Sequence, residues 1–277
     1  MTTDTISNRY LTGDYAPVHN ELTNAPLAVE GQLPTELNGT YLRIGPNPID
    51  SAHPDTYHWF QGDGMVHAVT IAQGQARYSN QWVRTDRAAN QLNEHPLADQ
   101  PPDVIPDAIS VANTGLVAHA GRILALYEVA LPVEIRADGS TAGRYDFDGR
   151  LQSAMTAHPK IDPSTGELHF FGYNILGPPY LRYHVADKTG LLMRTEEIAI
   201  PGPSMMHDFA ITQDHIVWFD LPVLFDLDLA SQGRFPYEWR PNYGAADWHH
   251  APHRERQSSA LVRPRPLLRL PRAQRLR

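Results

Sequence analysis

The sequence of 277 residues contains no cysteine. Without cysteine the chain can form neither a disulfide framework nor a thiolate metal site, so a bound metal would need nitrogen or oxygen ligands. The first seven residues lack a basic region followed by an apolar run. No stretch approaches the roughly 18 apolar residues that a membrane span requires. These absences predict a cytoplasmic protein that is neither secreted nor membrane-spanning.

Positive charge is also scarce, since 23 basic residues oppose 31 acidic ones and leave a formal net charge of -8. Nucleic acid binding needs a basic face that neutralises phosphates, so this balance argues against a nucleic acid partner. An acidic surface that keeps the protein soluble is the simplest interpretation of the charge.

The sequence shows no sustained helical period. Instead, short apolar and β-branched runs recur about every ten residues, separated by turn formers such as 46–48 and 137–140. This pattern predicts an all-β protein, and many evenly spaced strands suit a propeller, a sandwich or a barrel. The length allows one large domain or two smaller ones, and we favour one. The expected strands cover residues 40–44, 65–71, 76–83, 116–119, 123–129, 168–173, 181–185, 196–200 and 215–220.

The last residues, 246–277, differ in composition from the rest of the chain. They contain eight arginines, no lysine and two acidic residues, Asp247 and Glu255. Residues 263–272 alternate arginine, proline and leucine without a helix or strand pattern. We therefore predict a body over residues 1–245 and a disordered, Arg/Pro-rich tail over residues 246–277. Taken alone, such a basic tail is typical of a segment that binds an anionic partner.

Two short histidine segments are the strongest indication of function. They are residues 157–163 (AHPKIDP) and residues 206–212 (MHDFAIT). Imidazole is the commonest side-chain metal ligand, and two histidines on strands about fifty residues apart suit a metal bound where several sheets converge. His158 and His207 are therefore the candidate metal ligands.

Together with other motifs, these segments resemble the carotenoid cleavage oxygenase family over about residues 26–244. Several motifs that match in order along one chain are specific, although any one alone would be weak. The further matching segments are residues 37–48 (LNGTYLRIGPNP), 58–68 (HWFQGDGMVHA), 77–85 (RYSNQWVRT), 112–114 (ANT) and 125–128 (ALYE).

The resemblance implies a seven-bladed β-propeller, of which this chain would cover about half, with Fe(II) bound on the axis by four histidines. By motif match, His158 corresponds to the first ligand and His207 to the second. Glu128 corresponds to an outer carboxylate that accepts a hydrogen bond from a ligand histidine. Such a carboxylate fixes the tautomer and orientation of the ligating imidazole.

Members of this family use O2 to split a conjugated carbon-carbon double bond into two carbonyl products. The resemblance therefore implies a carotenoid or apocarotenoid as the apolar small-molecule substrate, with a stilbene as the alternative. We identify no lysine that could engage the phenol of a stilbene, which slightly favours carotenoids. The resemblance also allows a peripheral membrane contact for substrate uptake.

Other residues of these segments have structural interpretations. His67 lies in a family motif but is expected to be structural, and Asp63 between two glycines is most simply a tight turn. Glu128 is expected to be a buried acceptor rather than a solvated strand end. Six histidines outside the motifs are expected to be hydrogen-bonded core residues rather than ligands: His19, His53, His95, His169, His184 and His215.

The other two histidine ligands are not found in the expected context. His249, His250 and His253 lie in the basic tail, and we do not assign them as ligands. Residues 260–277, back-translated and read one nucleotide later, permit a segment that resembles the family's third histidine motif. We hypothesise a frameshift near Ala245 or Ala246, with the third histidine encoded out of frame across Pro271 and Arg272.

This hypothesis predicts a truncated chain that binds iron weakly and cleaves nothing alone, because an open ring exposes unpaired strand edges. The alternatives to a dioxygenase are an inactive remnant or an interaction module that uses the basic tail. A propeller hydrolase would need a pair of carboxylates, and we find no convincing pair.

Overall fold

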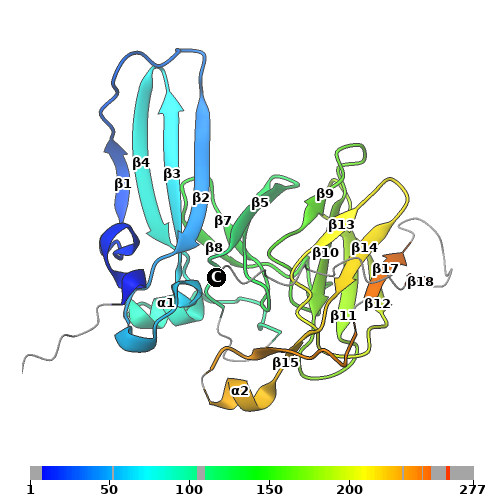
Figure 1. The fold of residues 1–277 in the computed structure, drawn as a ribbon. Coiled ribbons are helices and arrows are strands. Elements are labelled where there is room, and N and C mark those ends of the chain that lie inside the picture. The colour runs from blue at the N-terminus through cyan, green and yellow to red at the C-terminus, as the bar shows by residue number, and fades with distance from the viewer. Residues whose placement is uncertain are drawn as a thin grey trace, which may run out of the picture. The chain divides into compact units, whose positions relative to one another are not determined.

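A computed structural model of the chain describes residues 8–51, 53–104, 110–232, 234–244, 246–250 and 260–262. Figure 1 shows the strands and helices of the chain. The chain divides into two compact units. The first comprises Met1–Tyr173 and Arg182–Glu197, and the second comprises Asn174–Leu181 and Ile198–Arg277.

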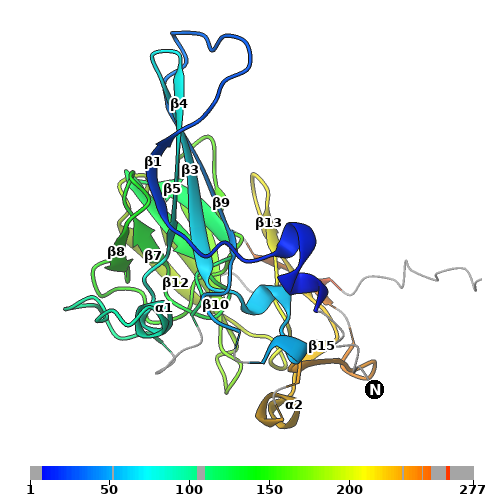
Figure 2. The ribbon, with the colours of Figure 1, turned by 90° about the vertical axis from the view of Figure 1, so that its left-hand side faces the viewer.

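The first sheet has four antiparallel strands in the order β1-β4-β3-β2. Its strands are β1 (Leu22–Pro26), β2 (Gly39–Pro46), β3 (Gly64–Ala72) and β4 (Gln75–Trp82). The turned view of Figure 2 shows this sheet close to edge-on. A two-residue turn joins β3 to β4, with φ of 52° at Gln73 and 73° at Gly74. Two positive φ values match the right-handed twist of the hairpin strands, so this local sequence sets the hairpin.

Two further four-stranded sheets belong largely to the first unit. The second sheet follows chain order and contains β5 (Gly115–His119), β6 (Arg122–Leu126), β7 (Val133–Ile135) and β8 (Thr141–Arg144). The third sheet contains β9 (Lys160–Ile161), β10 (Leu168–Tyr173), β11 (Leu181–Ala186) and β12 (Leu192–Ile198), in the order β12-β11-β10-β9. Ala120 and Gly121 join β5 to β6 with φ of 50° and 76°, which repeats the turn chemistry of the first sheet.

The core of the first unit consists of apolar side chains from these sheets. One cluster joins β6 to β10 through Leu124, Leu126, Leu168 and Phe170, all of which are buried. Every residue of β10 is buried, so this strand is covered on both faces. Apart from His169, β10 carries no charged or strongly polar side chain, which agrees with that burial, since a strand exposed on one face would alternate.

The second unit contains a four-stranded sheet in the order β13-β14-β17-β18 and a two-stranded sheet. Its strands are β13 (Phe209–Ile211), β14 (Ile216–Asp220), β15 (Val223–Phe225), β16 (Tyr237–Trp239), β17 (Ala246–His250) and β18 (Ala260–Val262). Phe209 and Trp218 stack across β13 and β14 with ring centroids 5.2 Å apart.

Helices are few and short in the described residues. The α-helices are α1 (Asp86–Gln91) and α2 (Leu227–Ser231), and the 3-10 helices are η1 (Arg9–Leu11), η2 (Gly13–Tyr15), η3 (Pro54–Thr56) and η4 (Trp59–Gln61). Thr85 and Asp226 cap the α-helices through their side chains. Among the described residues, no helix is long and apolar enough to cross a membrane.

The architecture confirms the all-β prediction. The predicted boundary at residue 246 stays a prediction, but β17 and β18 lie beyond it and pair with each other. Disorder therefore does not extend to these two strands, because β17 also pairs with β14 along five residues. Residues 263–277 lie outside the described part of the chain.

Candidate metal centre

His158 lies two residues before β9 rather than on a strand as predicted. Its backbone N-H donates to Thr156 Oγ1 at 3.2 Å. Thr156 in turn donates its backbone N-H to the carbonyl of Phe171 at 2.7 Å. The segment is therefore anchored to β10, while the His158 side chain remains 34% exposed.

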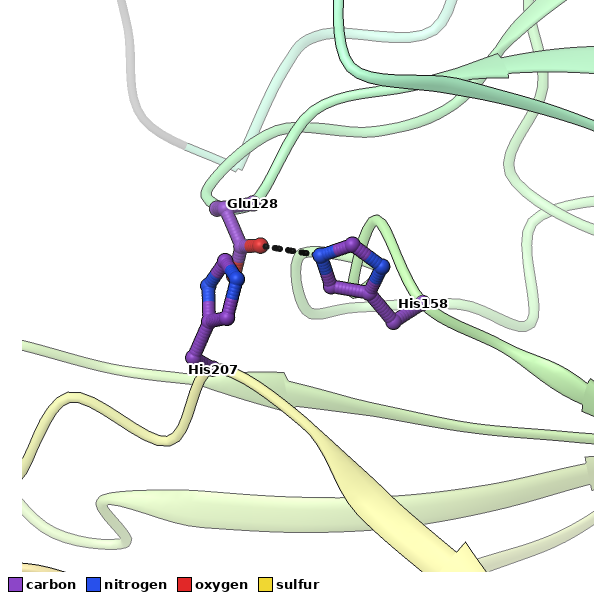
Figure 3. A group of neighbouring side chains, drawn as sticks. All are labelled: Glu128, His158 and His207. Carbon is purple, nitrogen blue, oxygen red and sulfur yellow. Dashed lines mark ion pairs between the residues drawn. The ribbon is translucent and has the colours of Figure 1, made fainter.

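Glu128 lies in the turn that directly follows β6, whereas we expected it within a strand. Its side chain is 16% exposed, and Glu128 Oε1 lies 3.6 Å from His158 Nε2 (Figure 3). This distance is longer than a hydrogen bond. The structure therefore brings the two residues together, and the predicted hydrogen bond from a ligand histidine to Glu128 stays a prediction.

The backbone around Glu128 is also tied to the histidine segment. Met155 donates its N-H to the carbonyl of Ala130 at 3.0 Å. Tyr173, at the end of β10, donates its hydroxyl to Glu128 Oε2 at 3.3 Å. No motif identified Tyr173, because its contact with Glu128 spans 45 residues and follows only from the sheet arrangement.

His207 belongs to the second unit and lies two residues before β13 (Phe209–Ile211). It is not on a strand as predicted, and it occupies the same place relative to the first strand of its sheet as His158 does. Its side chain is exposed, and its N-H donates to the carbonyl of Met205 at 3.0 Å. Met206 and Phe209 are buried on either side of it, so the local backbone is held by packing.

The structural interpretation of His67 agrees with its contacts, because Nδ1 of His67 lies 2.6 Å from the Tyr78 hydroxyl. His169 and His184 are buried and hydrogen-bonded, as expected for core residues. Burial lowers the pKa of His184 to about 3. The core interpretation is wrong for four other histidines, which are exposed: His19, His53, His95 and His215.

Asp63 is more than a turn residue. Its side chain is buried, and its Oδ1 lies 3.3 Å from Nε of Arg87 on α1. Burial raises the pKa of Asp63, and the charge of Arg87 opposes this shift. Sequence reasoning missed this pair because the motif suggested a turn, and burial of the carboxylate depends on the packing of α1.

Glu128, His158 and His207 each offer one donor atom that could bind a metal ion. Imidazole nitrogen with carboxylate oxygen suits iron, cobalt or zinc, so the donor chemistry fits the metal that the resemblance implies. The described residues do not include His253, Pro271 or Arg272, and the hypothesised third histidine lies outside them.

Comparison with known families places the chain. The model of the family described as "RPE65: Retinal pigment epithelial membrane protein" matches residues 15–264. A carotenoid cleavage oxygenase of Mycobacterium tuberculosis is 43% identical over 221 residues, covering 79% of this chain and 44% of the relative. A carotenoid 9,10(9',10')-cleavage dioxygenase 1 of Phaseolus vulgaris is 38% identical, and the match covers 79% of this chain and 45% of the relative.

Solved structures agree with this assignment. A lignostilbene dioxygenase of Pseudomonas brassicacearum matches with a TM-score of 0.77 and 29% identity, covering 91% of this chain and 55% of that one. A cobalt-substituted Synechocystis ACO matches with a TM-score of 0.73 and 24% identity, covering 89% of this chain and 57% of that one. This match supports the fold. These neighbours have the β-propeller fold, as predicted.

The chain spans less than half the length of the curated relatives it matches. The family match nevertheless covers most of this chain, including both histidine segments and Glu128. The chain therefore belongs to the RPE65 and carotenoid cleavage oxygenase family.

Proposed function

We propose that this chain carries part of an Fe(II) centre that, with O2, cleaves a conjugated double bond of a carotenoid or apocarotenoid into two carbonyl products. The observation that carries the proposal is the approach of Glu128 Oε1 to His158 Nε2 at 3.6 Å, which places a carboxylate beside an accessible imidazole. Two curated relatives are named for carotenoid cleavage, which supports the reaction class.

In this proposal His158 and His207 supply neutral imidazole nitrogens to the iron, and Glu128 orients His158. A carboxylate beside a ligating imidazole raises its basicity and fixes the ring. The 3.6 Å separation between Glu128 Oε1 and His158 Nε2 supports this assignment. When bound, Fe(II) supplies open coordination positions and the electrons that O2 activation requires.

A stilbene is the second candidate substrate. It is favoured by the match to the lignostilbene dioxygenase, which has a TM-score of 0.77. The higher identity to the mycobacterial carotenoid cleavage oxygenase, 43% against 29%, favours a carotenoid-type substrate. A cytoplasmic location with a peripheral membrane contact for uptake of the apolar substrate is part of the proposal.

Iron stoichiometry tests the centre before any assay of turnover. In an anaerobic titration with Fe(II) to saturation, followed at equilibrium, near one bound iron per chain supports the proposal, because weak binding lowers the affinity and not the stoichiometry. A value near zero contradicts it and favours a non-enzymatic remnant or an interaction module. The variant His169→Phe is the matched control, since His169 lies in the core rather than at the centre.

Turnover separates the substrates. We expect a protein with the plus-one reading frame restored after Ala245 to convert an apocarotenoid to two carbonyl products faster than a hydroxystilbene. Product analysis by chromatography and mass spectrometry measures both reactions. The 277-residue chain is expected to show no cleavage, and cleavage by this chain would overturn that expectation. Failure of the repaired protein on both substrates would contradict the proposed function.

A further inference from the structure

Glu128 has two carboxylate oxygens that face different residues. Oε1 lies 3.6 Å from His158 Nε2, as Figure 3 shows, and Oε2 accepts a hydrogen bond from the hydroxyl of Tyr173 at 3.3 Å. The terminal torsion of a glutamate is broad, so the carboxylate has no strong preference of its own. A donor at one oxygen therefore helps to decide where the other oxygen points.

Tyr173 is itself held firmly in place. It is 7% exposed and forms the last residue of β10, a strand whose six residues are all buried. Its ring stacks on Phe171 with centroids 6.2 Å apart. A buried tyrosine hydroxyl usually finds a polar partner, and here Glu128 accepts its hydrogen bond.

The end of β10 also lies directly against the segment that leads to His158. A Cβ atom on Gly172 would lie 2.1 Å from the carbonyl oxygen of Ala154, so only glycine allows this approach. Next to it, the carbonyl of Phe171 accepts the N-H of Thr156 at 2.7 Å. The position of the Tyr173 hydroxyl is therefore tied to the backbone that carries His158.

The turn that carries Glu128 is joined to the same segment. The N-H of Met155 donates to the carbonyl of Ala130 at 3.0 Å. The residues around 128–130, 154–158 and 171–173 thus form one hydrogen-bonded unit within the first part of the chain. Tyr173 adds a side-chain hydrogen bond to these backbone contacts, because its hydroxyl donates to the Glu128 carboxylate.

We propose that Tyr173 is a positioning residue for Glu128. Its hydroxyl holds one carboxylate oxygen, so that the other oxygen faces the His158 ring. The consequence for metal binding rests on the proposed function, whereas the orientation of the carboxylate concerns only residues of this chain. The hydrogen bond of 3.3 Å is long for an O-H donor, so its effect is expected on orientation more than on stability.

The test is the variant Tyr173→Phe, made in the full 277-residue chain and titrated anaerobically with Co(II). We expect Co(II) to bind about tenfold more weakly than in the wild type, which is the lower end of the loss seen for outer partners of metal ligands. The visible absorption of bound Co(II) should also change, because the orientation of the ligating imidazole changes.

Tyr183→Phe is the matched control. Tyr183 is also a buried tyrosine of the same sheet, but its hydroxyl bonds His169 at 2.5 Å rather than Glu128. We expect its Co(II) affinity to stay within about twofold of the wild type. In a Glu128→Ala background, Tyr173→Phe should have no further effect, since the carboxylate is absent.

Equal Co(II) affinity in Tyr173→Phe and Tyr183→Phe would overturn the positioning role. If the wild type takes up no Co(II), the metal centre of the proposed function fails, and crystal structures then decide the role of Tyr173. A Glu128 carboxylate that turns away from His158 in Tyr173→Phe supports the role, and an unchanged carboxylate contradicts it.

Discussion

His158 and His184 lie in the same compact unit but in opposite environments. His158 stands before β9 with a side chain that is 34% exposed, beside the carboxylate of Glu128. His184 lies inside β11 and is 1% exposed. Its Nε2 lies 2.8 Å from Ser153 Oγ, and its Nδ1 lies 3.0 Å from Thr195 Oγ1. The same residue type thus lies in two different environments, one partly exposed beside a carboxylate and one buried between hydroxyl groups.

The two imidazole rings differ in their exposure and in the protein groups that lie beside them. Both nitrogens of His184 are engaged by hydroxyl groups, and the ring stacks on Phe170 with centroids 5.0 Å apart. Burial lowers its pKa to about 3, so it stays neutral at physiological pH. His158 is accessible and lies next to a carboxylate, as expected for the metal ligand that we propose. We therefore expect the two histidines to respond oppositely to substitution.

The largest effect is expected for metal affinity in His158→Ala. Loss of a direct ligand should weaken Co(II) binding by about 100-fold or more, beyond the loss expected from outer partners. The unfolding free energy should change by less than about 1 kcal/mol, because the side chain is partly exposed. Co(II) titration and urea unfolding measure the two quantities. A metal affinity equal to that of the wild type would remove His158 from the centre.

The reverse result is expected for His184→Ala. This variant should lower the unfolding free energy by about 2–4 kcal/mol, because it opens a cavity and deprives Ser153 and Thr195 of a buried partner. Urea unfolding at neutral pH measures the loss. Metal affinity per folded chain should stay near that of the wild type. A large fall in metal affinity would contradict the view that, of these two histidines, only His158 serves the metal site.

The pH dependence of stability sharpens the comparison further. The folded pKa of His184 is about 3, below the value of about 6.5 expected in the unfolded chain. As the pH falls below 6.5, the unfolded chain binds a proton that the folded chain does not, so the folded state loses stability. Between pH 6.5 and 4.5 this amounts to about 2 kcal/mol.

Urea unfolding of the wild type and His184→Ala at both pH values measures this contribution. The variant lacks the buried imidazole, so its loss of stability on acidification should be smaller by about 2 kcal/mol. Parallel losses in the two proteins would mean that His184 is protonated equally in the folded and unfolded states.

The smallest effect is expected for Tyr183→Phe, which removes one hydrogen bond from a second buried histidine, His169. We expect a loss of about 1 kcal/mol in unfolding free energy, typical of one buried hydrogen bond. The ring of Tyr183 stays in place, so little packing is lost. Thermal and urea unfolding measure the change, and a loss above about 3 kcal/mol would indicate that the hydroxyl supports a wider network.

Much of the fold could be predicted from local sequence. The β3–β4 hairpin follows from alternating residues around Gln73 and Gly74, whose backbone conformations match the turn. The strand expected over residues 123–129 ends earlier, at Leu126. The apolar residues after it are buried in a turn instead, because Ala130 and Leu131 pack in the core without pairing in β6. Apolar character predicts burial, but it does not predict strand pairing.

The candidate site was predictable only in part. Motifs identified His158 and Glu128, and the structure brings these two together. Neither the contact of Tyr173 with Glu128 nor that of the buried Asp63 with Arg87 was predicted, since the residues next to them in the sequence do not reveal these partners. Their partners are 45 and 24 positions away, so their contacts depend on how the sheets and α1 pack.

The sequence by itself determined the strand-rich architecture, the absence of thiolate chemistry and the residue types that could bind a metal. These properties depend on local backbone preference and on composition, which any stretch of the chain carries with it. Only the tertiary structure decided which histidines are core residues and which carboxylate oxygen faces which partner. Burial and hydrogen bonding between distant segments depend on how the sheets pack, because packing brings together residues that are far apart in the sequence.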